Sequence, residues 1–195
     1  MQRLVVPVGH IEVICGPMFS GKSETLIGRL RRCTIARQTV QVFKPAVDDR
    51  YALEKIVSHS ALFLEAQLAT TSSSLAESVL PETQVVGIDE VQFFDADIVP
   101  VIERLADAGK RVVVAGLDMD YRGQPFETIA LLLPRAEYVT KMLAVCSRCG
   151  GPAGRSQRLI PVSERVVIGA QDTYEARCRR CHEPRPEATS GELFA

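Results

Sequence analysis

A glycine-bounded loop near the N-terminus dictates much of the fold. It reads Gly16-Pro17-Met18-Phe19-Ser20-Gly21-Lys22-Ser23 and matches the pattern G-x-x-x-x-G-K-[ST]. Successive backbone N–H groups in such a loop point inward around a phosphate, and the glycines permit that backbone path. The apolar run 11–15 before the loop predicts a strand, and the apolar spacing after it predicts a helix over about 23–36. Strand, loop and helix in this order indicate a nucleotide-binding α/β domain.

A second segment supplies the acidic groups that such a site needs. The apolar run 84–88 predicts a strand, and Asp89 at its end is the usual partner for the Mg²⁺ held by Ser23. Lys22 is expected to reach the β- and γ-phosphate oxygens of a bound nucleotide. Glu90 points in a different direction from Asp89, because adjacent residues do not share one. We therefore interpret Glu90 as a general base that accepts a proton from an attacking hydroxyl or water.

The remaining pattern predicts an α/β fold with a P-loop (RecA-like) parallel sheet flanked by helices. The runs 39–43 and 111–116 predict further strands, and their near-continuous apolar character suits a sheet covered on both faces. A helix is expected from Asp95 or Asp97 to about Gly109, and a short one near 61–68. Parallel strands would bring the loops 16–23, 89–94 and 117–126 to the same sheet edge.

Four of the six cysteines form two C-x-x-C pairs: Cys146, Cys149, Cys178 and Cys181. Paired C-x-x-C motifs in a reducing compartment favour a metal site, and a closed shell of four sulfurs suits a structural Zn²⁺. His182 is the competing ligand, and four unliganded cysteines are the alternative reading. Cys15 and Cys33 are expected to be small core residues.

The motifs divide the chain into three parts. We expect a nucleotide-binding domain over 1–145, a zinc-binding lasso module over 146–182 and a disordered tail over 183–195.

Charge and hydropathy exclude several classes of protein. The formal net charge of −1 argues against a protein held on nucleic acid by bulk electrostatics. The longest apolar run, residues 112–117, is too short to span a bilayer, and no secretory signal is read at the N-terminus, so we expect a cytoplasmic protein.

Two other functions compete as interpretations of the nucleotide-binding motifs. One is a helicase-like ATPase that uses the zinc module to grip nucleic acid, with Glu90 activating water. The other is a nucleotide-dependent switch, but the guanine-reading Asn-Lys-x-Asp motif cannot occur because the chain has no Asn.

Several motifs, taken together, carry a family resemblance. In chain order they are residues 16–23, Asp89-Glu90-Val91-Gln92-Phe93-Phe94, Gly116-Leu117-Asp118 with Pro125-Phe126, and the paired cysteines around Tyr174. This combination resembles the type II thymidine kinases, the zinc-containing cellular family, over nearly the whole chain from about residue 10 to 181. The joint set is far more specific than a phosphate-binding loop alone.

The resemblance implies transfer of the γ-phosphate of ATP to the 5′-hydroxyl of thymidine or deoxyuridine, giving dTMP. It makes Glu90 the proton acceptor, gives Asp89 and Ser23 to Mg²⁺, and places Gln92 beside them. It assigns further nucleotide contacts to Asp48, Asp49 and Arg50. The nucleoside pocket that it implies is lined by Met18, Phe93, Leu117, Tyr121 and Phe126, with lasso contacts from Ser156, Arg165, Val166, Val167, Ile168, Gly169 and Tyr174. Members of the family are usually homotetramers that dTTP inhibits.

Three positions depart from the family's pattern. Ser156 stands where a Thr near the thymine methyl group is expected, Arg165 replaces an aliphatic residue, and Val91 replaces a smaller one. These departures leave the chemistry intact and bear only on how tightly the methyl group is enclosed.

Overall fold

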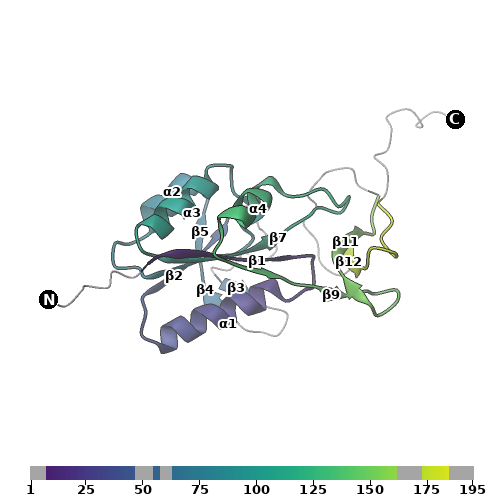
Figure 1. Ribbon diagram of the computed structural model, residues 1–195, viewed down its shortest axis with the longest axis horizontal. Helices are drawn as coiled ribbons and strands as arrows, with labels where there is room; N and C mark the ends of the chain where they lie inside the picture. The colour runs from purple at the N-terminus through teal and green to yellow at the C-terminus, as the bar shows by residue number, and fades with distance from the viewer. Residues whose placement is uncertain (1–7, 47–54, 58–62, 162–172, 185–195) are drawn as a thin grey trace.

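The computed structural model describes residues 8–46, 55–57, 63–161 and 173–184. Its centre is a six-stranded sheet in the order β5-β2-β6-β7-β1-β8, and every pairing in it is parallel (Figure 1). The strands are β1 (His10–Gly16), β2 (Val40–Pro45), β5 (Gln67–Ala69), β6 (Val85–Ile88), β7 (Arg111–Leu117) and β8 (Tyr138–Lys141). The predicted parallel sheet flanked by helices is therefore confirmed.

Helices cover both faces of the sheet, which explains the continuous apolar strands. They are α1 (Lys22–Ile35), α2 (Ser72–Ser78), α3 (Ile98–Asp107) and α4 (Glu127–Leu132), with 3₁₀ turns η2 (Val91–Phe93) and η3 (Leu133–Arg135). Figure 1 shows α1 below the sheet and the other three helices above it. Leu30 of α1 packs so closely on β6 that a Cβ at Gly87 would lie 2.4 Å from its Cδ1. Burial of these apolar faces supplies most of the stabilisation of such a domain.

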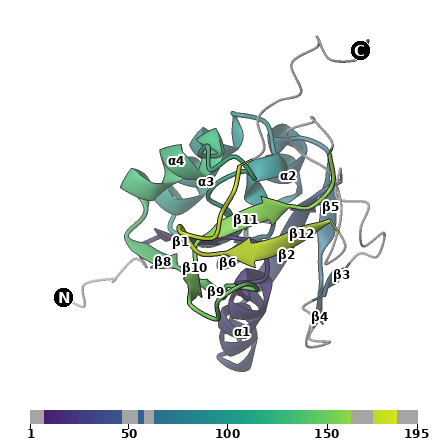
Figure 2. The ribbon, with the colours of Figure 1, turned by 90° about the vertical axis from the view of Figure 1, so that its right-hand side faces the viewer.

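Three small antiparallel pairs lie outside the main sheet. They are β3 (Lys55–Val57) with β4 (Phe63–Glu65), β9 (Ala144–Val145) with β10 (Pro152–Ala153), and β11 (Arg155–Arg158) with β12 (Tyr174–Arg177). We call the last two pairs and their connections the cysteine module (residues 144–158 and 173–183). It lies beyond the carboxyl ends of β1 and β7, and Figure 2 views it from the front.

The sequence-based expectations for the core are mostly confirmed. The helix after β6 begins with Asp97 as its N-cap residue and ends before Gly109, whose φ of 85° is the left-handed conformation that favours glycine. The helix expected near 61–68 is wrong. Within the described residues this stretch forms β4 and β5, because β5 pairs with β2 and tertiary pairing outweighs local propensity. The strand expected to stop before Lys44 runs on to Pro45.

Two further expectations concern the ends of the chain and the membrane. Of the expected tail at 183–195, only Glu183 and Pro184 belong to the described residues, and the Glu183 N–H donates to Gln157 Oε1 at 2.8 Å. None of the helices in the described part of the chain is both long and apolar enough to cross a bilayer.

A buried ionic cluster fixes β1 at the end away from the phosphate loop. The Glu12 carboxylate accepts hydrogen bonds from Arg111 Nε at 2.6 Å and Arg29 Nη1 at 2.7 Å, and His10 Nε2 lies 3.2 Å away. Burial on its own would raise the pKa of Glu12, but the two guanidinium groups outweigh burial and hold the pKa below its ordinary value. The ionised form of Glu12 is therefore favoured more strongly in the folded protein than in the unfolded chain.

This cluster predicts an acid-sensitive contribution to stability. Because the folded-state pKa of Glu12 is depressed, its contribution is complete above the unfolded pKa and is lost as the pH falls through the folded pKa. Glu12→Gln should lower the free energy of unfolding at pH 7 by about 3 kcal/mol and reduce its dependence on pH below about 5. Urea unfolding at pH 7 and pH 4 measures both. The exposed control Glu77→Gln should match the wild type, and an equally steep acid loss in Glu12→Gln would contradict the prediction.

Candidate functional site

The phosphate loop (residues 16–23) connects β1 to α1 and is shaped by its glycines. At Gly16, φ is 152° and a Cβ would lie 2.5 Å from the carbonyl oxygen of Met142, so the backbones approach too closely for a side chain. Gly21 adopts the left-handed conformation with φ 80° immediately before α1. The Ser20 hydroxyl donates to the Pro17 carbonyl at 2.8 Å and braces the turn. The loop predicted from the sequence is present between a strand and a helix.

Lys22 is the buried cation of this loop. Its Nζ donates to the Pro17 carbonyl at 2.8 Å. Burial lowers the pKa of Lys22, while the negative charges of Glu90, Asp89 and Asp118 raise it. The ammonium group therefore lies in the combined field of carboxylates from the ends of β6 and β7. A desolvated cation held in this way suits the phosphate oxygens of a nucleotide.

Ser23 and Asp89 bring two oxygen ligands together. Asp89 follows β6 directly and is buried, and burial together with the Glu90 charge raises the pKa of Asp89 to about 7. A hydrogen bond from Ser23 opposes that rise, so the hydroxyl and the carboxylate are in contact. Hydroxyl and carboxylate oxygens are ligands that Mg²⁺ prefers. The pair therefore fits the magnesium site predicted from the sequence.

Glu90 is held in place by Gln92. Its backbone is left-handed, with φ 50° and ψ 39°, and its N–H donates to Asp89 Oδ1 at 3.0 Å. The Gln92 Nε2 donates to the Glu90 carboxylate at 2.6 Å, and Gln92 Oε1 accepts from the Leu117 N–H at 3.0 Å. Buried Gln92 therefore connects the second acid of the site to the end of β7. The Asp89 and Glu90 carboxylates therefore have different hydrogen-bond partners.

Aromatic residues gather beside these acids. Phe93 and Phe126 meet edge to face, with ring centroids 6.3 Å apart and planes at 83°. Phe126 precedes α4 and is buried, whereas Phe93 is partly exposed in η2. Leu117 lies at the same sheet edge, where its backbone N–H donates to Gln92 Oε1. The structure therefore brings together three of the residues that the resemblance gave to the nucleoside pocket.

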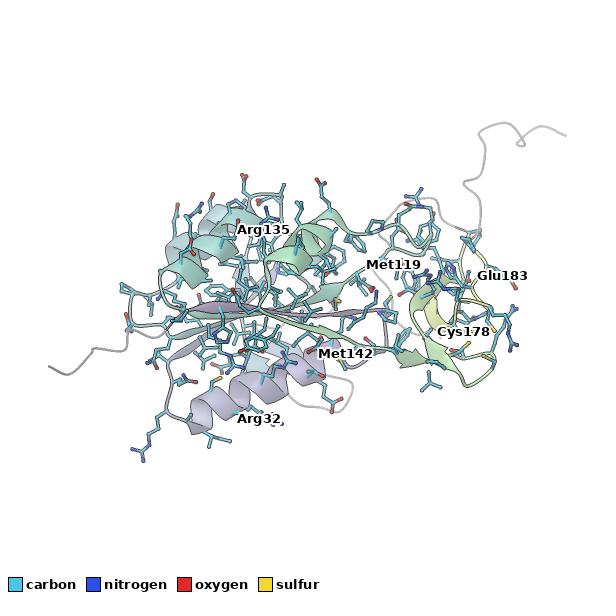
Figure 3. The ribbon with its side chains drawn as sticks, viewed as in Figure 1. Arg32, Met119, Arg135, Met142, Cys178 and Glu183 are labelled. Atoms are coloured by element: carbon cyan, nitrogen blue, oxygen red, sulfur yellow. The ribbon has the colours of Figure 1, made fainter. Side chains whose placement is uncertain are left out.

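The cysteine module touches the phosphate loop directly. Ser156 of β11 is buried, and its hydroxyl accepts the N–H of Met18 at 3.0 Å. On the same strand, Arg155 Nη1 lies 2.7 Å from the sulfur of Met119 in the segment after β7. Figure 3 labels Met119 at the end of the sheet facing the module, which carries Cys178 and Glu183. Ser156 therefore connects the module to the loop.

A second set of contacts joins the module to Tyr121. The His182 ring Nε2 donates to the Tyr121 carbonyl oxygen at 2.8 Å. The guanidinium carbon of Arg158 lies 3.8 Å from the centroid of the buried Tyr121 ring, and the Arg158 guanidinium also donates to the hydroxyl of Tyr174. Tyr121 and Tyr174, which the resemblance assigned to nucleoside binding, are thus close together. Arg158, which our sequence analysis did not single out, lies between them.

The four paired cysteines are arranged to hold one metal ion. Their Sγ atoms all lie within 4.8 Å of one another, and the Sγ atoms of Cys149 and Cys178 are 3.7 Å apart. A Zn–S bond of about 2.3 Å in a tetrahedral shell requires sulfurs about 3.8 Å apart, so the cluster fits Zn²⁺. A separation of 3.7 Å is too long for a disulfide between these two sulfurs. These four residues would hold the ion, which would stabilise the fold of the cysteine module and leave no coordination position open for catalysis.

The surroundings of the cluster shift the pKa values of its thiols. Backbone N–H groups, first that of Cys178, lower the pKa of Cys146 to about 6, so a thiolate is favoured at neutral pH. Cys181 lies beside the Cys178 sulfur, and this contact raises the pKa of Cys181 to about 12. A metal cation bound to the four sulfurs would displace the protons that the crowded thiols retain. His182 is not part of the cluster, because its ring donates to Tyr121.

Some of the sequence-predicted site residues lie outside the described part of the chain. They are Asp48, Asp49, Arg50, Arg165, Val166, Val167, Ile168 and Gly169. Two contacts went unnoticed in the sequence. Asp118 at the end of β7 is buried and pairs with Lys141 Nζ at 3.0 Å. Asp118 belongs to the motif Gly116-Leu117-Asp118 and follows an apolar strand, but neither feature predicts its pairing with Lys141, and nothing in the sequence links Arg158 to Tyr121.

Comparison with known proteins shows the family to which this chain is similar. The family model described as "Thymidine kinase" matches residues 9–182. The chain is 54% identical over 187 residues to a protein named "Thymidine kinase" from Rhodothermus sp. (strain ITI 518), covering 94% of this chain and 86% of that one. Among solved structures, domain III of the replication initiation protein DnaA from Thermotoga maritima aligns with a TM-score of 0.44 and 16% identity. That alignment covers 69% of this chain and 55% of the other.

The cysteine cluster predicts one zinc ion per chain. Cys149→Ser replaces a sulfur ligand by a weaker oxygen ligand, so the purified variant should hold far less than one zinc per chain. Elemental analysis of unchelated protein measures this content. The control Cys33→Ala, on the buried face of α1, should keep its zinc. A metal-free wild-type protein would contradict the assignment.

Proposed function

This chain belongs to the thymidine kinase family, and on that premise we propose that it transfers the γ-phosphate of ATP to the 5′-hydroxyl of thymidine or deoxyuridine. One observation carries the proposal. The phosphate loop, the Asp89–Glu90 pair and the cysteine module meet at one edge of the sheet through the contacts of Ser23 with Asp89 and of Met18 with Ser156. A phosphate donor on the loop and a nucleoside beside the module would therefore be neighbours.

The phosphate side of the reaction rests on residues of the loop. Backbone N–H groups of residues 16–23 and the N-terminus of α1 would bind the phosphates, and Lys22 would contact their outer oxygens. Mg²⁺ held by Ser23 and Asp89 would neutralise part of the phosphate charge. Asp48, Asp49 and Arg50 are proposed as further nucleotide contacts on the family resemblance alone.

The proton of the attacking hydroxyl is proposed to go to Glu90. Gln92 holds this carboxylate by a 2.6 Å hydrogen bond and is itself fixed by the Leu117 N–H, so the base has one orientation. A fixed base removes the cost of orienting it in the transition state. The resemblance gave Gln92 to the ATP site beside Asp89 and Ser23, and its two hydrogen bonds support a further role in holding Glu90.

The nucleoside is proposed to bind between the aromatic edge and the cysteine module. Phe93, Phe126 and Leu117 would line one side, with Tyr121, Tyr174 and Ser156 on the other. A site whose buried polar groups read one base rejects other bases sharply, because a wrong base leaves those groups unpaired. Further nucleoside contacts from residues 165–169 are proposed on the resemblance.

The resemblance also leads us to propose a homotetramer and feedback inhibition by dTTP. The four free thiols of the cysteine cluster, which a reducing compartment preserves, support a cytoplasmic location.

A transfer assay tests the proposed function directly. The protein is incubated with γ-labelled ATP, Mg²⁺ and a panel of the four natural deoxynucleosides, deoxyuridine and single-stranded DNA. We expect labelled monophosphate from thymidine and deoxyuridine and none from the purine deoxynucleosides. ATP hydrolysis that DNA stimulates and thymidine does not would instead favour the helicase-like alternative.

The assignment of the base makes a separate prediction. Glu90→Gln keeps the size of the side chain and removes its basicity, so kcat should fall by about 10²–10⁴-fold. Affinities for thymidine and ATP, measured by calorimetry, should change by less than about threefold. Glu77→Gln, on the exposed side of α2, is the matched control and should retain wild-type kcat. Unchanged turnover in Glu90→Gln would remove Glu90 as the base.

A further inference from the structure

Arg158 is an almost fully buried cation for which the proposed chemistry gives no role. Its residue exposure is 2%, although arginine is rarely buried unless its charge is satisfied. Its guanidinium carbon lies 3.8 Å from the centroid of the Tyr121 ring. Its Nη2 and Nε donate to the hydroxyl of Tyr174 at 2.7 and 3.2 Å. One planar group thus stacks on one tyrosine and donates two hydrogen bonds to the other.

The two tyrosines come from parts of the chain that lie far apart in the sequence. Tyr121 belongs to the segment that follows β7 at the sheet edge, whereas Tyr174 begins β12 of the cysteine module. Arg158 and Tyr174 are paired in the register of β11 and β12, and the Leu159 N–H donates to the Thr173 carbonyl next to them at 2.9 Å. Arg158 therefore stands at the end of the hairpin next to Leu159 and Thr173, and it contacts both tyrosines.

We propose that Arg158 is a positioning residue for nucleoside binding, which holds Tyr121 and Tyr174 in one fixed arrangement. The inference rests on the proposed function, since both tyrosines are nucleoside contacts only under that function. A guanidinium is suited to this task because it is planar and has five donors in a rigid fork. A lysine would keep the charge but lose the stacking face and the second hydrogen bond.

The attachment of the module to the sheet does not depend on Arg158. The Ser156 hydroxyl accepts the Met18 N–H, and His182 donates to the Tyr121 carbonyl. The amide of Gln157 also exchanges hydrogen bonds with the backbone of Glu183 inside the module. These contacts remain when Arg158 is changed, so the fold and the cysteine cluster should persist. A positioning role should then appear in nucleoside binding and not in the binding of ATP.

The test compares Arg158→Lys with the matched control Arg155→Lys. Arg155 lies on the same strand and contacts the sulfur of Met119. Arg158→Lys should raise KM for thymidine about tenfold, with KM for ATP and zinc content within about twofold of the wild type. Arg155→Lys should leave all three near wild-type values. An unchanged thymidine KM in Arg158→Lys, beside an active wild type, overturns this proposal alone.

Two further outcomes complete the test. A wild-type protein that does not phosphorylate thymidine overturns the proposed function and this inference together. If Arg158→Lys does not fold, Arg158→Gln replaces it in the test, because the neutral amide keeps a donor at this position and removes the buried charge and the guanidinium plane. A raised thymidine KM at constant ATP KM in Arg158→Gln supports the proposal, and an unchanged thymidine KM overturns it.

Discussion

The docking of the cysteine module on the carboxyl edge of the sheet is the contact on which the whole site depends. A parallel sheet brings its strand ends to one edge, and the phosphate loop, Asp89 and Asp118 lie there for that reason. The hydrogen bond from the Met18 N–H to Ser156 joins the module to the loop itself. Without this contact, the sheet edge would hold only half of a two-substrate site.

The polar groups at this edge are connected in chains and do not act singly. Gln92 joins the Glu90 carboxylate to the backbone of Leu117, and Ser23 joins Asp89 to the start of α1. Arg158 joins the two tyrosines in the same manner. Buried networks of this kind hold side chains in one geometry, because a displaced member leaves its partners unpaired. The cost of orienting the groups is thereby met when the protein folds.

Local patterns in the sequence were enough to predict the loop, the acids and the cysteines, since each depends on spacing along a few residues. The path of the chain between β2 and β6 could not be read in this way. Residues 61–68 favour a helix locally, but β5 is stabilised by its pairing with β2, more than twenty residues earlier. Arg158 likewise acquires its surroundings from Tyr121, which no spacing rule relates to it. The resemblance placed Gln92 beside the acids, but its hydrogen bond to Glu90 could not be predicted from spacing, because it depends on the tight turn of η2.

The most direct measurement of the central claim is a crystal structure with thymidine and a non-hydrolysable ATP analogue bound together. We predict that the triphosphate lies on residues 16–23 and that the 5′-hydroxyl of thymidine lies within hydrogen-bond distance of the Glu90 carboxylate. The thymine base should lie between Phe126 and the Tyr121–Tyr174 pair. A nucleoside bound away from the cysteine module, or with its 5′-hydroxyl beyond the reach of Glu90, would contradict the account.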